Sequence, residues 1–373
     1  MLESAVTIGR VAGIRIGIHY TWFIIFALLT LSLMLLFQAG YPHWPQAQVT
    51  TTAVVTSLLF FLSIVLHELG HSLVALRKGI PVRSITLFIF GGVAQTERDA
   101  ERAQDEFWIA IAGPLVSLAL AAAFYVLSAL MQGLSEPAAV AFGWLAFINL
   151  VVAVFNLIPG FPLDGGRVFR ATVWGLSGNP AKGMAWAVMG GRLVAYGLLG
   201  VGAWLAIMHG LLLNGLWLAA IAWFLLSAAE ASSRDFTLGQ LLRGVSARQI
   251  LRPDVPQVAA GTALQNWVDA GALAGGERAA VVTRGADVVG LVTLSDARKV
   301  ARERWGLVAV DEVMTPRERL QVVAPDTGLE DVLRAMERQS LNQVPVMEGE
   351  RLVGWIDRER LMRAIRVRSE AAG

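Results

Sequence analysis

The sequence predicts a multi-span α-helical membrane protein with a smaller α/β domain after the last span. Hydrophobic residues make up 55% of the 373 residues, charged residues only 16%, and the mean hydropathy is +0.57. In a soluble domain roughly a quarter of the residues are charged. The charges are also unevenly distributed: long uncharged runs fill most of the first 230 residues, and the remainder has an ordinary soluble composition. These observations indicate a membrane-embedded part followed by a soluble part.

Charge and cysteine content exclude some kinds of site and partner. The net charge is only +2 and no lysine-rich stretch occurs, so the sequence predicts no nucleic-acid partner. Cysteine is absent, which excludes disulfides and thiolate metal ligands. Any metal site must therefore use His, Asp or Glu side chains.

Six apolar segments are long enough to cross a bilayer as helices, which takes about 20 residues because the helix must satisfy its own backbone polar groups. They are Ile18–Phe37, Val54–Leu76, Phe107–Met131, Ala138–Ile158 and two spans within Leu193–Ala229, with a turn around His209–Gly215. The first apolar run is too long for a signal peptide, so we interpret it as an uncleaved span. The sequence thus predicts a lipid bilayer around a domain that covers residues 1–231.

Basic residues predict the orientation of these spans. An even number of spans places both termini on one side, and cytosolic loops carry an excess of Lys and Arg. The loops at 41–49, 132–137 and 209–214 contain neither, whereas the other connections do. The basic residues of those connections are Arg10, Arg15, Arg77, Lys78, Arg83, Arg98, Arg102, Arg167, Arg170 and Lys182. We therefore expect a multi-pass protein of the cell membrane with both termini in the cytosol.

The second predicted span contains the motif His67-Glu68-Leu69-Gly70-His71. Residues four apart share one face of a helix, so both imidazoles can bind one zinc ion while Glu68 takes a proton from the attacking water. Zinc lowers the pKa of its bound water to roughly 7. A soluble helix can match this motif by chance. Within a span, however, each ionisable group costs roughly 2.5–3.5 kcal/mol and is usually functional. We interpret the motif as a catalytic zinc site.

A third metal ligand is expected, because catalytic zinc normally takes three protein ligands and leaves one position open. The best candidate is Asp164, which follows the fourth span. The second and fourth spans both run toward the cytosol, so Asp164 falls on the same side as His67 and His71. The alternative is that Asp164 only caps a helix over Gly165–Trp174.

The two motifs resemble the site-2 protease family of intramembrane metalloproteases. That family combines H-E-x-x-H with an asparagine eight residues before the aspartate of an L-D-G signature, here Asn156 and Leu163-Asp164-Gly165. The resemblance covers the first four spans. It implies zinc ligands His67, His71 and Asp164, the general base Glu68, and Asn156 to position substrate or stabilise the oxyanion. For Asn156 the alternative is an ordinary hydrogen bond between helices.

Two further segments resemble the family. Ser84–Phe90 is rich in β-branched and aromatic residues and ends at Gly91-Gly92, which predicts a strand or hairpin. In the family such a strand can pair with an unwound substrate by β-addition. The alternative is an ordinary amphipathic strand in a loop. Gly113 and Ser117 are small residues four apart, which predicts close packing of the third span on the second.

The soluble remainder contains two similar halves. We place a linker at residues 232–244 and the halves at 245–306 and 307–373. Each half runs from a polar start through a short helix, a strand, a glycine turn, another strand and a helix. This repeat resembles a CBS-domain pair, and residues 311–316 resemble the usual opening of a second unit.

The CBS resemblance implies a nucleotide site. In such modules a Thr/Ser-x-x-Asp at the last strand–helix junction contacts the ribose of an adenine nucleotide, and the first half carries Thr293 and Asp296 in this pattern. The second half has Asp357 and Arg360 at the matching positions, so at most one intact site is expected. The alternative is that Asp296 only caps its helix.

The sequence therefore predicts an intramembrane zinc metalloendopeptidase that cleaves transmembrane or membrane-associated protein substrates, as in regulated intramembrane proteolysis. The CBS pair is expected to modulate this activity through an adenine nucleotide and to offer a surface for homo-oligomers. The alternative is a CBS-gated membrane transporter or channel. A transporter would explain charges inside the membrane, but not their arrangement as H-E-x-x-H with L-D-G.

Overall fold

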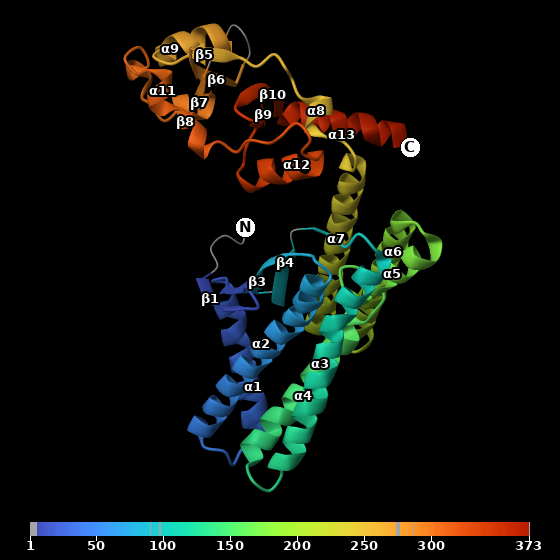
Figure 1. Cartoon of the computed structure of the whole chain (residues 1–373). Coiled ribbons are helices and arrows are strands. Elements are labelled where there is room, and N and C mark those ends of the chain that lie inside the picture. Colours follow the sequence, from blue (N-terminus) through green and yellow to red (C-terminus); the bar gives the residue numbers. More distant parts are fainter. Residues whose placement is uncertain (1–5, 90, 97, 274–276, 286, 373) are drawn as a thin grey trace. The chain divides into compact units, whose positions relative to one another are not determined.

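The computed structural model describes residues 6–89, 91–96, 98–273, 277–285 and 287–372 (Figure 1). The chain separates into two compact units, Met1–Arg234 and Asp235–Gly373, which we call the membrane unit and the C-terminal unit. The boundary falls inside one helix, α7 (Leu212–Leu242). Residues 232–242, expected to form a linker, are therefore helical.

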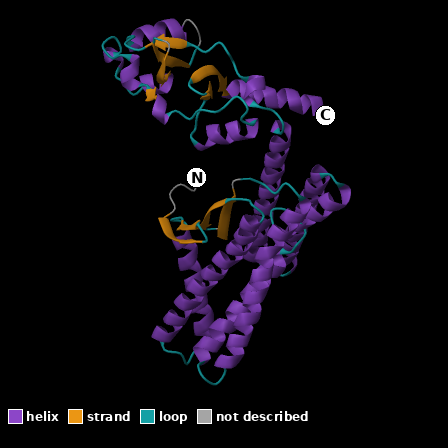
Figure 2. Ribbon diagram, in the orientation of Figure 1, coloured by secondary structure: helices purple, strands orange, loops and turns teal. Residues whose placement is uncertain are grey.

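Six helices are long and apolar enough to cross a membrane, which is the number that the sequence predicts (Figure 2). They are α1 (Trp22–Gly40), α2 (Gln46–Arg77), α3 (Ala103–Met131), α4 (Glu136–Asn156), α6 (Pro180–Met208) and α7. Helix α6 begins well before the predicted Leu193. Its start is fixed by Asn179, whose side chain accepts hydrogen bonds from the backbone of Ala181 and Lys182. The charge of Arg192 limits the apolar run to Leu193 and beyond but does not interrupt the helix.

Helix α2 packs against α1, α3 and α4. It approaches α3 closely at Gly70, where a Cβ atom would lie 2.8 Å from Val116 Cγ2 and 3.1 Å from the carbonyl oxygen of Ala112. Small residues permit such contacts between membrane helices. The shorter amphipathic helix α5 (Asp164–Ser177) follows α4 and packs against α3 and α6. Helix α3 therefore contacts both elements that carry the predicted metal ligands.

A four-stranded sheet packs against α2 in the membrane unit. Its strands, in spatial order, are β1 (Val6–Val11), β2 (Ile14–Ile18), β3 (Val82–Phe88) and β4 (Gly91–Thr96). Only the central pair, β2 with β3, is parallel. Ile14 and Ile85 are buried in one hydrophobic cluster with Phe61 and Leu69 of α2. The sheet is thus anchored on the helix that carries the H-E-x-x-H motif.

This sheet corrects the expectation for Ser84–Phe90. Strand β3 covers most of that segment but lies between β2 and β4, so both of its edges are already hydrogen-bonded. The parallel partner β2 comes from a segment far away in the chain, which a local pattern does not reveal. Among the described strands, β4 is the one next to β3 that has a neighbour on one side only. Phe90 lies outside the described residues.

The C-terminal unit contains two strand hairpins and short helices, with one mixed sheet. The first half forms β5 (Gln257–Ala259), β6 (Ala279–Arg284) and β7 (Asp287–Thr293), and the second forms β9 (Gln343–Glu348) and β10 (Arg351–Asp357). Strand β8 (Thr315–Pro316) pairs with β7. The helices are α8 (Ala247–Ile250), α9 (Leu264–Trp267), α10 (Leu294–Ala297), α11 (Val310–Val313), α12 (Leu329–Arg338) and α13 (Arg358–Ala372), with single turns at Val268–Leu273, Arg302–Arg304 and Arg317–Arg319.

The opening segment of each half packs into the other half. Val245 lies in a cluster with Val344 and Ile356 of the second half, whereas Val310 lies with Val282 of the first. The parallel pairing of β5 with β6 is matched by a parallel bridge in the second half. The two halves are therefore structural repeats that share their cores.

Candidate active site

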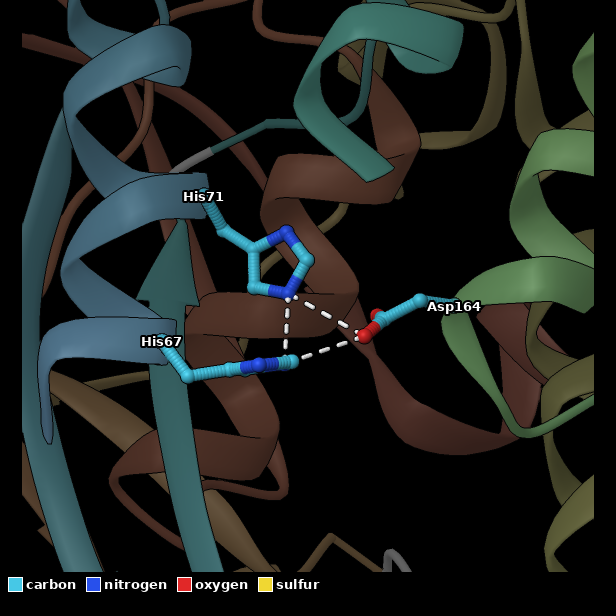
Figure 3. Close-up of side chains that lie close together, drawn as sticks. All are labelled: His67, His71 and Asp164. Atoms are coloured by element: carbon cyan, nitrogen blue, oxygen red, sulfur yellow. Dashed lines mark hydrogen bonds and ion pairs between the residues drawn. The ribbon is translucent and has the colours of Figure 1, made fainter. Parts of the chain in front are cut away.

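Helix α2 presents two buried histidines on one face. His67 and His71 are one turn apart, and their Nε2 atoms lie 3.2 Å from each other (Figure 3). Only 5% and 7% of the two residues are exposed. The four-residue spacing of the motif thus produces the shared face that the sequence predicts.

Asp164 approaches the same point from α5 (Figure 3). Its Oδ2 atom lies 3.1 Å from His67 Nε2 and 3.2 Å from His71 Nε2. Asp164 is the first residue of α5, and the cap position belongs to Leu163. The carboxylate therefore faces the histidine pair, as expected for a third ligand, and does not occupy the cap position that the alternative requires.

Helix α3 orients both imidazole rings through contacts with their Nδ1 atoms. His71 Nδ1 donates a 2.7 Å hydrogen bond to the carbonyl oxygen of Ile109, which can only accept. His67 Nδ1 lies 2.9 Å from Ser117 Oγ. In the neutral ring of His71 the proton is thus on Nδ1 and the lone pair is on Nε2, which points toward Asp164. Such outer partners fix the ring and tautomer of histidines that bind metals.

The three groups fit a tetrahedral metal ion. Zinc bonds of about 2.0–2.1 Å place neighbouring ligand atoms about 3.3–3.4 Å apart, close to the 3.1–3.2 Å separations here. Two imidazoles and one carboxylate are also a usual ligand set for catalytic zinc. Burial raises the pKa of Asp164, but the contacts with His67 and His71 lower it by a larger amount. The net shift of the pKa is therefore downward and favours the ionised carboxylate.

Comparisons with known proteins identify the family. The model of peptidase family M50 matches residues 55–197, and the CBS-domain model matches residues 310–367. The relative sll0528 of Synechocystis sp., named as a zinc metalloprotease, is 32% identical over 371 residues, which cover 98% of this chain and 96% of the relative. This chain belongs to peptidase family M50, the site-2 proteases.

Other similar proteins carry related names. Rip3 of Mycobacterium tuberculosis, also named as a zinc metalloprotease, is 32% identical over 373 residues, which cover 98% of this chain and 94% of Rip3. A solved structure, the site-2 protease from Methanocaldococcus jannaschii, is 28% identical, covers 62% of this chain and 95% of that chain, and has a TM-score of 0.43. Family membership and the six apolar helices make the chain a multi-pass membrane zinc metalloprotease, and the transporter alternative is not favoured.

In this site-2 protease, Gly113 borders the predicted metal ligands. A Cβ atom at this position of α3 would lie 2.1 Å from His71 Nε2 and 2.7 Å from His67 Nε2. Any side chain there would collide with the ligand atoms. The small-residue spacing from Gly113 to Ser117 indicates helix packing, as predicted. It does not reveal that both positions contact the histidines.

Glu68 lies beside the ligand group but is not part of it. It is half-buried on α2 and faces β4, where a Cβ atom at Gly92 would lie 2.6 Å from Glu68 Cγ. The glycine of β4 therefore makes room for the glutamate. This position beside the ligands agrees with the role of a base and not of a fourth ligand.

The two asparagines of α4 have different surroundings. Asn156 is half-buried at the C-terminal end of α4, and its side chain makes no hydrogen bond with the described residues. Asn149 is buried and donates to the carbonyl oxygen of Leu145 and, at 3.4 Å, to Ser63 Oγ of α2. The link between helices that we weighed for Asn156 is thus made by Asn149.

The predicted nucleotide residues belong to the C-terminal unit and satisfy each other. Thr293 Oγ1 donates to Asp296 Oδ2 at 2.7 Å, and the backbone N–H of each residue donates to the other's side chain. Lys299 Nζ donates to the other carboxylate oxygen at 2.8 Å. This is a capping box at the start of α10, so the helix-capping alternative describes the observed contacts.

Proposed function

We propose that this chain is an intramembrane zinc metalloendopeptidase in which His67, His71 and Asp164 hold the zinc ion and Glu68 is the general base. One observation carries the proposal. Two ligand atoms on α2, a helix apolar enough to cross a membrane, lie within 3.2 Å of each other and of a third on α5, whose Asp164 is 97 residues from His67. Ionisable groups within a membrane cost free energy, so those that occur there usually have a function.

The residues divide the work of peptide hydrolysis. Zinc supplies Lewis acidity, which acidifies water and polarises a peptide carbonyl. Ser117 and the carbonyl of Ile109 hold the two imidazoles in place. Glu68 accepts a proton from the attacking water at its carboxylate and delivers it to the leaving amide nitrogen. Asn156 binds the substrate backbone or its developing oxyanion, for which its amide can donate two hydrogen bonds.

The substrate is a transmembrane or membrane-associated protein, as in regulated intramembrane proteolysis. A helical substrate shields its peptide bonds, so the scissile segment must unwind first. The free edge of β4 can pair with the unwound segment by β-addition. Support for this docking comes from the contact between Gly92 of β4 and Glu68.

The C-terminal unit is proposed to bind an adenine nucleotide at Thr293 and Asp296 and thereby to modulate proteolysis. Binding must replace part of the capping box, because both side chains already bond to each other. Allosteric coupling of 1–3 kcal/mol would change activity by roughly 5–150-fold. CBS pairs from two chains can also associate, which would give a homo-oligomer.

The loop charges support a place in the cell membrane with both termini in the cytosol. Because the chain contains no cysteine, a single cysteine introduced at Gln132 reports the exposure of one loop to impermeant reagents. We expect the cysteine at position 132 to be labelled from outside the cell. Labelling of a cysteine at Ser369 from outside would contradict it.

The decisive experiment compares zinc content and cleavage in Glu68→Gln. A base that is not a ligand should leave about one zinc per chain and abolish cleavage of a co-expressed membrane substrate. The matched control is Glu101→Gln, which removes an exposed carboxylate that lies 3.5 Å from Arg98. Substantial cleavage by Glu68→Gln would refute the assignment of the base.

A further inference from the structure

A buried ion pair connects α5 to α3 close to Asp164. Glu106, in the first turn of α3, has no exposed surface, and its carboxylate pairs with the guanidinium of Arg170 in α5. Arg167 lies further away, with its Nε atom 3.9 Å from the same carboxylate. Arg170 is only 13% exposed, so both charges of the pair are shielded from water.

Arg170 also contacts the loop that precedes Asp164. Its guanidinium lies over the ring of Phe161, 5.5 Å from the centroid. Phe161 itself donates a backbone hydrogen bond to the carbonyl oxygen of Ala187 in α6. Arg170, six residues after Asp164, therefore contacts the loop three residues before Asp164. Its pair with Glu106 joins this contact to α3.

The next turn of α3 accepts a hydrogen bond from His71, one of the proposed metal ligands. Ile109, whose carbonyl oxygen accepts the hydrogen bond from His71, lies one helical turn after Glu106. A shift of α5 relative to this turn would therefore move Asp164 relative to His71. The ion pair links two groups whose relative position decides whether the three ligand atoms converge.

Stability alone does not account for this pair. Removing two charges from water is expensive, and apolar residues of similar size often give equal or greater stability. A planar guanidinium that pairs with a carboxylate and stacks on an aromatic ring instead fixes the orientation of the two segments that it connects. Outer partners of metal ligands have this effect, and their loss typically weakens metal binding roughly 10–100-fold.

We propose that Glu106 and Arg170 are positioning residues that hold Asp164 against the histidine pair. We call Glu106, Arg170 and Phe161 the Arg170 clamp. This inference rests on the proposed function, because it requires that Asp164 is a metal ligand. The clamp acts through Asp164, so its effect appears in the affinity and geometry of the metal site.

The test measures metal binding by the full-length chain in detergent. Zinc affinity is obtained by competition with a chromophoric chelator, and the visible spectrum of the Co²⁺-loaded protein reports the ligand geometry. Glu106→Gln and Arg170→Met should each bind zinc roughly 10–100-fold more weakly and change the Co²⁺ bands. Asp105→Asn is the matched control, since Asp105 lies in the same turn but pairs with Lys78 at the end of α2. It should match the wild type.

A double variant separates positioning from folding. Each single variant leaves a buried charge without its partner and can misfold, whereas Glu106→Met with Arg170→Met removes both charges together. The folded double variant should still bind zinc weakly and show altered Co²⁺ bands. Wild-type affinity and spectrum in the double variant would overturn the clamp, as would an equal loss in Asp105→Asn.

Asp164→Asn distinguishes the failure of the clamp from the failure of the proposed function. If Asp164→Asn binds zinc like the wild type, Asp164 is not a ligand and the proposed function fails with the clamp. If Asp164→Asn loses zinc while the double variant keeps it, only the clamp is overturned.

Discussion

The two units use similar polar side chains in opposite ways. In the membrane unit, His67, His71 and Asp164 direct their ligand atoms to one common point, and Asp164 is 97 residues from His67. In the C-terminal unit, Thr293 and Asp296 are three residues apart and bond to each other. Local pairs of this kind are ordinary helix caps. Convergence of distant buried polar groups needs another explanation, and the proposed zinc site supplies one.

The largest expected effect is the loss of a histidine ligand. His71→Ala should bind zinc more than about 100-fold more weakly, because even the loss of an outer partner costs roughly 10–100-fold. Proteolysis should vanish with the metal. Zinc analysis on the purified protein measures this, with the exposed His43→Ala as control. A wild-type zinc content in His71→Ala would show that His71 is not a metal ligand, and the contrast between the two units would no longer hold.

The second prediction tests whether Asp164 belongs to the metal group or is a cap like Asp296. Asp164→Asn keeps the size of the side chain but loses the anionic ligand, so zinc content and cleavage should both fall. A mere cap would keep its zinc and lose about 0.5–2 kcal/mol of stability. Metal analysis combined with thermal unfolding separates these outcomes.

A smaller effect is expected from steric pressure on the ligands. Gly113→Ala places a methyl group 2.1 Å from His71 Nε2, so the ring or the helix must move. Overpacking costs about 1–3 kcal/mol, which corresponds to roughly 5–150-fold weaker zinc binding. Gly197→Ala in α6 is the control, since apart from the adjoining backbone of its own helix no described atom lies within 4 Å of the added methyl. Equal zinc affinity in both variants would contradict the close contact.

The smallest expected effect concerns the C-terminal unit. Asp296→Ala should destabilise this unit by about 0.5–2 kcal/mol, and so should Asp357→Ala, whose carboxylate caps α13 through the backbone of Arg360. Only Asp296→Ala should also abolish nucleotide binding. Calorimetry with ATP, ADP and AMP on the full-length chain tests this. If the wild type binds none of them, both carboxylates are caps alone.

Patterns within one segment were predictable from the sequence. Length and apolar composition predict the six spans, because a helix in a membrane satisfies its backbone internally. The four-residue spacing of His67 and His71 determines their shared face, because an α-helix has 3.6 residues per turn. The repeated order of strands and helices likewise indicates the CBS pair. Asp164 could be proposed because its span ends on the same side as His67 and His71, although its own segment also permits a cap.

Contacts between distant segments were decided only by the tertiary structure. Strand β2 pairs with β3 and makes it an inner strand, so the free edge belongs to β4. Gly113 and the carbonyl of Ile109 border the ligands without any local signal. Glu106 and Arg170 are each ordinary charged residues until α3 and α5 pack together. Periodicity reports the face of a single helix, whereas the partner of that face depends on how all the helices pack.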